Sequence, residues 1–408
     1  MHVHVDINSY FATLLQQEVP SLRGKPIGVI KEAGRTCIIA ASNEAKLYGV
    51  RTGTSSADAL ARCPGIMLLP ANFDMYGSAT RRLVELFQRL SPTPEIFSLD
   101  EAFIPYDELR ELHPDAVAFG TYIQQAIRTE LGEWVACSVG IGRTRLLAKM
   151  AGETAKKGSV TLVDKEKERE LLITTPFSDV CGVGWRLEKR LATLGVTRPF
   201  EISLIPKEDL RRHFGPFWSE ELFGIANGEE PSQLRRLAEP PAAAKSIGRS
   251  ITLFDLSNNK SDQYRVLCNL ASEVMHKARV LRLCGRRISI AVIGQERSWS
   301  RHITLITPIR QTKELFDQVK SIFARWSNEF AIIRFVVHLD LLEPWETQQL
   351  PFWHEWWRRE KTETAVDTIN RRYGIYTLRS GRLLSNATLI RPEVTGFLGD
   401  KSYQLLTE

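Results

Sequence analysis

The sequence predicts an α+β protein of several domains, and three observations support this fold class. At 408 residues the chain is longer than one ordinary domain, so two to four domains are expected. Short strand-like and helix-like segments alternate through the first 165 residues. A stretch rich in Pro and Ala then precedes a new run of strands with two helices, which is typical of a sheet covered by helices on one face.

The N-terminal part contains the strongest strand and helix patterns. Residues 2–6 alternate His and Val and end on an acid, which indicates a short strand. We expect further strands at 26–30, 36–41, 67–69, 96–99, 102–104 and 136–141. We expect helices, by apolar spacing and by Gly or Pro at their ends, at 9–17, 42–48, 55–62, 76–90, 117–131 and 145–155.

The C-terminal part has a different pattern. Short helices with Gly between them follow residue 165, and a linker is expected at 231–244 because of its three prolines. Beyond it, strands are expected at 246–254, 286–293, 302–306 and 332–341, with helices at 262–281 and 311–328. The tail from residue 344 contains four closely spaced tryptophans.

Composition limits the class of protein. The formal net charge of +6 is compatible with nucleic-acid binding but does not establish it. No run of about 18 apolar residues is present, so no membrane span is expected. The six cysteines form no CxxC pair, so a zinc site is not expected. Scattered cysteines and no signal-peptide pattern indicate a reduced, cytoplasmic location.

Acidic residues follow two of the expected strands. Asp6 ends the first strand, and Asp100 and Glu101 lie between two apolar strand segments. If these strands are neighbours, three carboxylates converge and repel one another unless cations are bound. Two Mg²⁺ ions held by such carboxylates can move a nucleotidyl group. Capping of turns or pairing with lysines is the alternative, and the acids alone allow a nuclease, a cyclase or a polymerase.

Ordered sequence blocks surround these acids. The blocks are 5–12 (VDINSYFA), 22–29 (LRGKPIGV), 42–51 (SNEAKLYGVR), 98–103 (SLDEAF), 140–142 (GIG), 146–151 (LLAKMA), 182–184 (GVG) and 245–250 (KSIGRS). Each block is weak evidence when taken by itself. In this order and spacing, from residue 3 to about 343, they resemble the Y-family DNA polymerases.

The resemblance implies a right-hand polymerase with a ferredoxin-like palm, small fingers, a helical thumb and an α+β little finger. The corresponding ranges are palm 1–10 and 72–165, fingers 11–71, thumb 166–230 with a helix-hairpin-helix, linker 231–244, little finger 245–343 and C-terminal tail 344–408. The activity implied is template-directed DNA synthesis across damaged template, from deoxynucleoside triphosphates on primer-template DNA. Low fidelity without proofreading is also implied.

The resemblance also assigns roles to single residues. Asp6, Asp100 and Glu101, with the Ile7 carbonyl, would hold two Mg²⁺ ions. Phe11 lies at the position of the family's steric gate, which excludes ribonucleotides by a clash with the 2′-hydroxyl. A core phenylalanine is the alternative. The nucleotide triphosphate would contact the backbone amides of Tyr10 and Phe11 and the side chain of Lys156, whereas Lys157 is expected on a solvated helix face.

The fingers motif departs from the common family pattern. Many members reach the triphosphate with a Tyr and an Arg, where this chain has Asn43 and Lys46. This Asn-Glu-Ala-Lys form is closer to the bacterial polymerase V catalytic-subunit type. Both residues can donate to phosphate, but Lys lacks the two-pronged geometry of Arg. The strength of nucleotide binding is therefore left open.

DNA and partner contacts are expected at three places. Gly182 and Gly184 can present backbone amides to a phosphate. Basic residues near little-finger strand starts would face the duplex, with a solvated edge as the alternative: Arg249, Arg282, Arg286 and Arg287. The tail segment 348–353 resembles the peptide by which polymerases bind the sliding clamp, through Gln349, Leu350 and Phe352. The alternative is a tail packed on its own protein through its tryptophans.

Two other functions compete with an active polymerase. The first is a catalytically silent Y-family paralogue that serves as a scaffold in a mutagenesis complex. Such a paralogue is expected to lose the carboxylates, whereas this chain keeps all three. The second is a nucleotide cyclase with a similar palm. The helix-hairpin-helix and the little-finger block argue against a cyclase.

Overall fold

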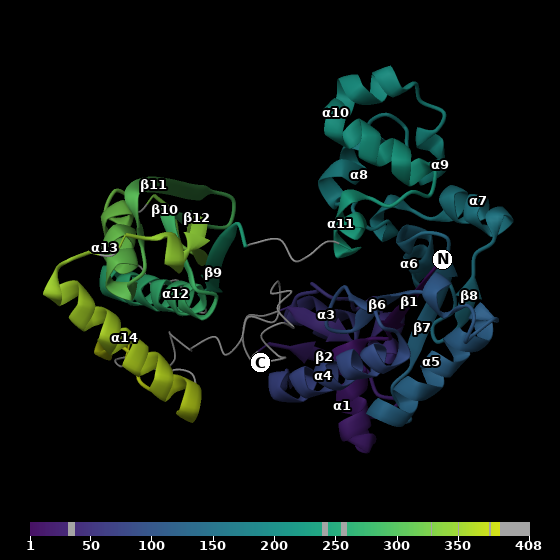
Figure 1. Cartoon of the computed structure of the whole chain (residues 1–408), viewed down its shortest axis with the longest axis horizontal. Helices are drawn as coiled ribbons and strands as arrows, with labels where there is room; N and C mark the ends of the chain where they lie inside the picture. The colour runs from purple at the N-terminus through teal and green to yellow at the C-terminus, as the bar shows by residue number, and fades with distance from the viewer. Residues whose placement is uncertain are drawn as a thin grey trace. The chain divides into compact units, whose positions relative to one another are not determined.

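The computed structural model describes residues 1–31, 37–238, 244–253, 259–327, 329–349, 351–374 and 377–383. These residues form two compact units (Figure 1). Unit 1 covers the described residues up to 238, and unit 2 covers those from 244 onward. No helix in the described ranges is long and apolar enough to cross a membrane.

Unit 1 is built on a five-stranded sheet with the strand order β5-β6-β1-β7-β8. Strand β1 pairs antiparallel with both β6 and β7, and β8 runs parallel to β7. The strands are β1 (His2–Ile7), β5 (Glu95–Ile96), β6 (Glu101–Pro105), β7 (Cys137–Gly142) and β8 (Val160–Leu162). The first strand of the sequence is therefore the middle strand of the sheet.

The alternation in β1 separates an apolar face from a polar one. Val3, Val5 and Ile7 join the core formed with α4 (Phe73–Leu90) and α5 (Ala116–Leu131). Because side chains alternate along a strand, His2, His4 and Asp6 lie on the other face of the sheet. That face is covered by α6 (Arg145–Thr154), whose Gly152 lies against the His4 ring.

Helix α6 lies unusually close to the sheet because of small residues. A Cβ at Gly140 of β7 would lie 2.0 Å from the Ala148 carbonyl oxygen and 2.5 Å from the Gly152 nitrogen. Only glycine fits at such a backbone approach. The GIG block therefore holds α6, and with it Lys149, against the polar face of β1.

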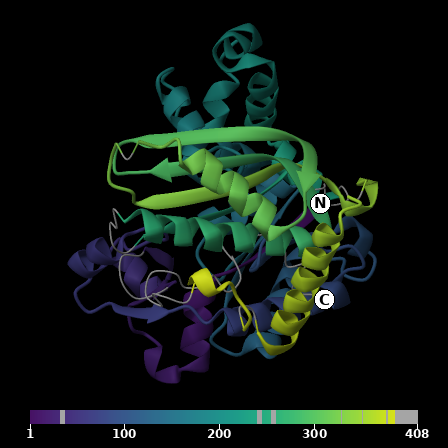
Figure 2. The same ribbon diagram turned by 90° about the vertical axis from the view of Figure 1, so that its left-hand side faces the viewer.

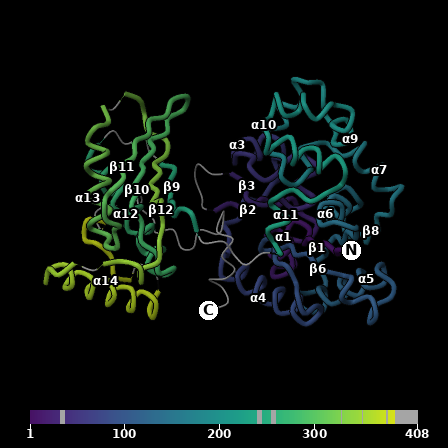
Figure 3. The backbone as a smooth tube through the Cα atoms, turned by 45° about the horizontal axis from the view of Figure 1, so that its top comes forward, coloured from purple at the N-terminus to yellow at the C-terminus, as the bar shows by residue number. Residues whose placement is uncertain are grey.

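The remaining elements of unit 1 form two smaller groups. A three-stranded sheet of order β3-β2-β4 has its own small core with α2 and α3. The five helices α7 to α11 form another core with residues of β6 and α6, and their path can be followed in Figure 3. The bounds are α1 (Tyr10–Glu18), β2 (Ile27–Ile30), β3 (Ile38–Ala41), α2 (Asn43–Leu47), α3 (Ser56–Arg62), β4 (Met67–Pro70), α7 (Lys165–Thr174), α8 (Trp185–Ala192), α9 (Pro199–Ile202), α10 (Lys207–Ala226) and α11 (Ser232–Arg235).

The expected linker at 231–244 begins later than the sequence indicates. Residues 232–235 form helix α11, and Leu234 is fully buried in the core of α7 to α10. Pro231 precedes this helix rather than opening an extended connection, as prolines commonly do at helix starts. The described residues up to 238 therefore belong to unit 1, and residues 239–243 lie outside the described ranges.

Unit 2 is a four-stranded antiparallel sheet of order β11-β10-β12-β9. Helices α12 (Lys260–Val280) and α13 (Thr312–Phe323) pack on one face of it (Figure 2). The strands are β9 (Ser246–Thr252), β10 (Leu283–Ile293), β11 (Ser298–Ile309) and β12 (Arg334–Pro344). In β10 the residues Ile288, Ile290 and Val292 face the helices, which leaves the alternate residues on the uncovered face.

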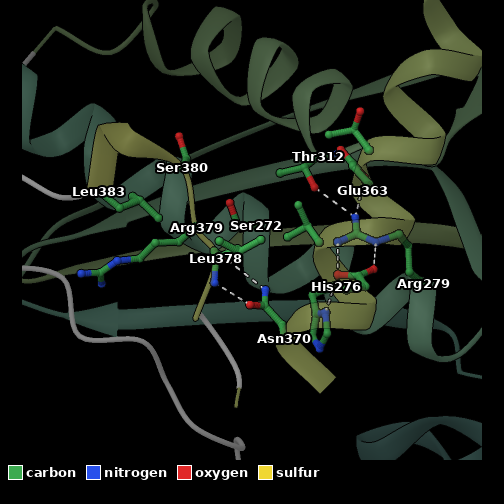
Figure 4. A pocket seen from close by; sticks show the side chains of 13 residues that line it. Ser272, His276, Arg279, Thr312, Glu363, Asn370, Leu378, Arg379, Ser380 and Leu383 are labelled. Carbon is green, nitrogen blue, oxygen red and sulfur yellow. Dashed lines mark hydrogen bonds and ion pairs between the residues drawn. The ribbon is translucent and has the colours of Figure 1, made fainter. Parts of the chain in front are cut away.

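The tail after unit 2's sheet forms a long helix, α14 (His354–Tyr373). Ion pairs attach it to α12, where Arg279 lies 2.7 Å from Glu363 and 2.5 Å from Asp367. The Trp356 ring is 9% exposed, and its Nε1 donates to Glu314 of α13 at 3.0 Å. A pocket of about 450 Å³ lies between α12, α14 and residues 378–383, and Figure 4 shows Arg279 and Glu363 among the side chains that line it.

Candidate active site

The pairing of β1 with β6 brings the predicted carboxylates together. Asp6, near the end of β1, is the register partner of Glu101, which begins β6. The Ile7 amide donates to the Asp100 carbonyl oxygen at 3.0 Å, so the two segments stay in contact beyond the ladder. Because the strands are antiparallel, the C-terminal end of β1 lies beside the N-terminal end of β6.

The expected strand at 96–99 is shorter than the sequence indicates. Only Glu95 and Ile96 form a strand, and the chain then turns. The amides of Phe97 and Ser98 both donate to the Glu101 carbonyl oxygen, at 3.0 and 3.1 Å. β5 and β6 are thus a hairpin, and Asp100 lies on its turn, where the Ser98 hydroxyl donates to its carboxylate at 2.5 Å.

The three acids differ in their protonation. Burial, together with the neighbouring charges of Asp100 and Glu101, raises the pKa of Asp6 to about 8. Burial also raises the pKa of Asp100. Burial acts in the same direction on Glu101, but the hydrogen bond to His4 and the charge of Lys149 outweigh it and lower the pKa of Glu101 to about 2.

Two residues that the sequence did not single out contact Glu101. The Lys149 Nζ lies 2.6 Å and the His4 Nε2 3.2 Å from Glu101, and both contact the same oxygen, Oε2. Lys149 also pairs with Glu153 at 2.9 Å. The signal for His4 was present in the sequence, because it lies two residues before Asp6 and therefore on the same face of β1.

The carboxylates suit a divalent cation by their chemistry rather than by a preformed geometry. Among the described residues, no group of three or more His, Cys, Asp or Glu side chains is arranged ready to hold a metal ion. Glu101 instead contacts Lys149 and His4 through one of its oxygens. Asp6 and Asp100 offer hard oxygen ligands, and a bound cation would offset both the burial and the neighbouring negative charges that raise the pKa of Asp6.

An aromatic stack borders the acids. The Phe11 ring stacks on Tyr76 of α4, with 4.2 Å between ring centroids, and Phe11 remains partly exposed. The neighbouring Tyr10 is buried, and its hydroxyl donates to the Tyr76 carbonyl oxygen at 3.0 Å. Tyr10 therefore anchors α1 to α4, whereas Phe11 presents part of its ring to solvent.

The predicted triphosphate contacts lie on two segments. Asn43 and Lys46 both lie on α2, and both bond to Ser9, at 3.2 and 2.6 Å. Ser9 was not predicted from the sequence. Lys156 is exposed in the turn after α6. The next residue, Lys157, is exposed, as expected, and its charge also lowers the pKa of both Asp6 and Lys46.

The predicted DNA contacts have different surroundings. Gly182 has a φ of 92°, and Gly184 is the N-cap of α8, so the turn needs its first glycine. The side chains of Arg282 and Arg286 are 76% and 43% exposed. Arg287 is exposed and, by alternation with Ile288, lies on the uncovered face of the sheet. Arg249 instead is 16% exposed and lies 3.9 Å from Glu273 of α12.

The predicted clamp segment is partly described. Gln349 and Phe352 are exposed, the latter at 90%, and Leu350 lies outside the described residues. Trp353 is also 71% exposed, whereas Trp356 is buried and Arg310 stacks on Trp345 at 4.2 Å. The alternative of a tail packed on its own protein is therefore found for Trp345 and Trp356, and the clamp contact stays a prediction.

Sequence profiles of one family match most of the chain. The impB/mucB/samB family matches residues 5–153, and its C-terminal domain matches 244–352. The helix-hairpin-helix motif of the same family matches residues 165–196, which include the Gly182 turn. The three matches thus cover most of the five-stranded sheet, the turn before α8 and the sheet of unit 2, while β8 lies between the first and second matched ranges.

Similar proteins extend this finding to the whole chain. A protein of Moorella thermoacetica named DNA polymerase IV is 31% identical, over 94% of this chain and 96% of its own. The DNA polymerase IV 2 of Mesorhizobium japonicum is 28% identical, over 98% of each chain. Both of these relatives carry DNA polymerase IV names, and the polymerase V type of the fingers motif stays a prediction.

Solved structures agree in fold. A Y-family DNA polymerase chimera superposes with a TM-score of 0.70 at 20% identity, over 84% of this chain and 99% of its own. An insertion ternary complex of Dbh DNA polymerase gives a TM-score of 0.56, over 83% and 98%. The α+β architecture is therefore that of a right-hand polymerase, as predicted. Together with the profiles and the 31% identical relative, it places this chain in the Y-family of DNA polymerases.

Proposed function

We propose that this chain is a DNA-directed DNA polymerase that extends a primer across damaged template, with low fidelity and without proofreading. The observation that carries the proposal is the convergence of Asp6, Asp100 and Glu101 at the junction of β1 and β6. The relatives named DNA polymerase IV support the same activity. A cytoplasmic location is part of this proposal.

The carboxylates would hold two Mg²⁺ ions, with the Ile7 carbonyl as a further ligand. Bound divalent ions supply activation of the primer 3′-hydroxyl and neutralise charge on the leaving pyrophosphate. The protein itself would hold the ligands together where the end of β1 lies beside the start of β6. Lys149 and His4 contact only one oxygen of Glu101, which leaves Oε1 as the oxygen available for an ion.

The neighbouring residues would select and hold the nucleotide. The partly exposed Phe11 ring, which stacks on Tyr76, would exclude a 2′-hydroxyl by a clash. Asn43, Lys46 and Lys156, with the backbone amides of Tyr10 and Phe11, would donate to the triphosphate. Lys157 is a second candidate for this contact because its charge affects both Asp6 and Lys46.

DNA binding would be independent of sequence. The Gly182–Gly184 turn can donate backbone amides to one phosphate, and Arg282, Arg286 and Arg287 can pair with others. Arg249 supports this role least, because it is mostly buried beside Glu273. The palm, fingers, thumb and little finger would correspond to the ranges given above. A sliding clamp would bind the exposed tail segment that includes Gln349 and Phe352.

Two alternatives predict different behaviour. A silent scaffold protein needs none of the three acids, yet this chain retains all three, and burial beside the other two acids raises the pKa of Asp6 to about 8. A nucleotide cyclase needs neither a helix-hairpin-helix nor a little finger, and both family profiles match here.

Primer extension decides among these functions. The full chain is incubated with Mg²⁺, deoxynucleoside triphosphates and a labelled primer on undamaged template or on template with an abasic site. We expect extension on both templates by the wild type and none by Asp100→Ala. A wild type that extends neither primer, even with a clamp supplied, would refute the polymerase proposal. Cyclic nucleotide formed from ATP alone would support the cyclase instead.

A further inference from the structure

Ser9 has an unusual backbone conformation for its position. It precedes helix α1 as the N-cap residue, with φ 54° and ψ 44°, in the left-handed region. Serine is a favoured N-cap because its hydroxyl accepts a hydrogen bond from the first turn. Here the Ser9 hydroxyl makes no capping hydrogen bond. A residue with a Cβ adopts this conformation at a cost, so the surrounding structure imposes it.

The Ser9 hydroxyl is directed to the fingers helix α2 instead. Lys46 Nζ donates to Ser9 Oγ at 2.6 Å, and Ser9 Oγ donates to Asn43 Oδ1 at 3.2 Å. One hydroxyl thus accepts from one residue and donates to the other. Asn43 and Lys46 follow Ser9 by 34 and 37 positions in the chain. The two hydrogen bonds therefore join the turn after β1 to α2.

The two partners remain available to a ligand. Asn43 and Lys46 are exposed, although partial burial and the charge of Lys157 lower the pKa of Lys46. Because Asn43 Oδ1 accepts from Ser9, its amide Nδ2 is left to donate elsewhere. Lys46 keeps two further N–H donors beyond the one that Ser9 accepts. The cluster therefore presents N–H donors of both residues to a ligand.

We propose that Ser9 is a positioning residue for the triphosphate of the incoming nucleotide, an inference that rests on the proposed polymerase function. Its hydroxyl fixes the Lys46 ammonium in place and sets the Asn43 amide with Nδ2 outward. A lysine has a flexible stem and no rigid fork, so an unheld lysine loses side-chain freedom when it binds phosphate. Ser9 restrains it beforehand, which strengthens binding through preorganisation.

A purely structural role makes a different prediction. If the bonds only attached α2 to the turn after β1, their loss would lower the unfolding temperature and reduce the rate at every nucleotide concentration. If they position phosphate donors, their loss would weaken nucleotide binding and leave the rate at saturating nucleotide nearly unchanged. The dissociation constant of the nucleotide and the maximal rate of incorporation therefore separate the two roles.

The experiment is single-turnover incorporation by the full chain on primer-template DNA, with the correct nucleotide varied. Ser9→Ala removes the hydroxyl and keeps the backbone strain, whereas Ser9→Gly removes both. We expect both variants to raise the nucleotide dissociation constant about fivefold to tenfold, with the maximal rate within about twofold of the wild type. In a Lys46→Met background, which lowers affinity by itself, adding Ser9→Ala should change the dissociation constant by less than about twofold.

Three results would overturn the inference. Unchanged affinity in both variants would remove the role of the hydroxyl. Loss in Ser9→Ala with recovery in Ser9→Gly would assign the effect to backbone strain. Full additivity of Ser9→Ala with Lys46→Met would show that Ser9 does not act through Lys46. A wild type that incorporates no nucleotide would instead refute the polymerase proposal, so the two failures are distinguishable.

Discussion

Asp6 and Glu101 face each other across two strands and yet have opposite pKa shifts. Burial and the charges of Asp100 and Glu101 outweigh those of Lys149 and Lys157 at Asp6, and its pKa rises to about 8. Glu101 has Lys149 and His4 against one oxygen, and its pKa falls to about 2. Glu101 is thus the charged member at neutral pH in the metal-free protein, and Asp6 is the member that a cation would ionise.

The raised pKa of Asp6 predicts how metal-free stability depends on pH. A folded-state pKa above the ordinary 3.8 means that the folded protein favours the protonated form, so this stabilisation is present at low pH and is lost as pH rises through about 8. With EDTA, the unfolding temperature should fall between pH 5 and pH 8.5. Thermal unfolding followed by circular dichroism measures it, and Mg²⁺ should restore more stability at the higher pH.

Asp6→Asn is the matched control for that dependence. The amide cannot ionise, so the fall in unfolding temperature should be clearly smaller in the variant than in the wild type. Glu101 does not interfere, because its lowered pKa costs stability only as pH falls toward about 2. Equal slopes for wild type and variant would mean that Asp6 is not the titrating group.

Phe11 predicts the sugar preference. Phe11→Ala removes the ring that stacks on Tyr76, and the ratio of deoxynucleotide to ribonucleotide incorporation efficiency should fall at least about tenfold. Steady-state incorporation of each nucleotide measures this ratio. Phe73→Leu is the control, since Phe73 touches the same tyrosine edge-on, at 6.3 Å between centroids. A ratio that is unchanged in Phe11→Ala would exclude Phe11 as the steric gate.

At the scale of elements, ion pairs are the main contacts between α14 and the rest of unit 2. Arg279 contacts Glu363 and Asp367, and Arg310 contacts Glu360 at 2.8 Å. The Glu363 carboxylate also accepts from the Thr312 amide at the start of α13. Few apolar side chains of α14 are buried, with Trp356 as the chief one. The helix therefore depends on partly buried ion pairs, which are costly to break one partner at a time.

Arg279→Met should destabilise unit 2. The variant leaves Glu363 and Asp367 without their shared cation, and the expected loss is ~3 kcal/mol. Urea unfolding followed by tryptophan fluorescence measures it, because Trp356 of α14 is buried and bonds to Glu314 of α13. The control is Arg358→Met, whose partner Glu355 is exposed on the same helix, with an expected change below ~0.5 kcal/mol. Similar losses in both variants would contradict the importance of the Arg279 contacts.

For the whole molecule, the formal charge of +6 can strengthen DNA binding only through basic side chains that are exposed and can contact phosphate. Arg287 is exposed on the uncovered face of unit 2's sheet, and Arg249 is mostly enclosed beside Glu273. The two arginines should therefore behave differently when removed. Removal of Arg287 should weaken DNA binding, and removal of Arg249 should lower the stability of unit 2.

Salt dependence measures the difference. Arg287→Ala should weaken binding to duplex DNA of any sequence and reduce the slope of log K against log salt by ~0.9. Arg249→Ala should leave that slope nearly unchanged and lower the unfolding temperature. Fluorescence anisotropy at several salt concentrations gives the slopes. The opposite pattern would mean that Arg249 reaches the DNA and Arg287 does not.

Local patterns predicted most elements, because periodicity is a local property. The alternation of residues 2–6 gave a strand that the structure extends to Ile7, and the helix expected at 145–155 ends at Thr154. The apolar run at 96–99 misled, because a hairpin turn carrying Asp100 needs contacts to Glu101 that periodicity does not encode. Helix α14 was not predicted, since ion pairs to Arg279 hold it rather than an apolar stripe.

The site was predictable only in part for the same reason. Acids at strand ends are visible in the sequence, but their convergence depends on β1 pairing with β6, which is a long-range property. Lys149 reaches Glu101 only because Gly140 and Gly152 let α6 approach the sheet. Ser9 and Lys46 are 37 positions apart, and no spacing rule joins them. The sequence thus indicated the three acids, whose role as metal ligands stays a prediction, and missed the residues that contact them.

The rate of single-nucleotide incorporation by Asp6→Asn at saturating Mg²⁺ tests the central claim most directly. The amide keeps the shape of the side chain and removes the charge that a divalent ion requires. We predict a rate at least about 1,000-fold below that of the wild type, equivalent to ~4 kcal/mol, with an unfolding temperature in EDTA at pH 8 that is equal or higher. Incorporation within about threefold of the wild-type rate would contradict the assignment of Asp6 to the metal site.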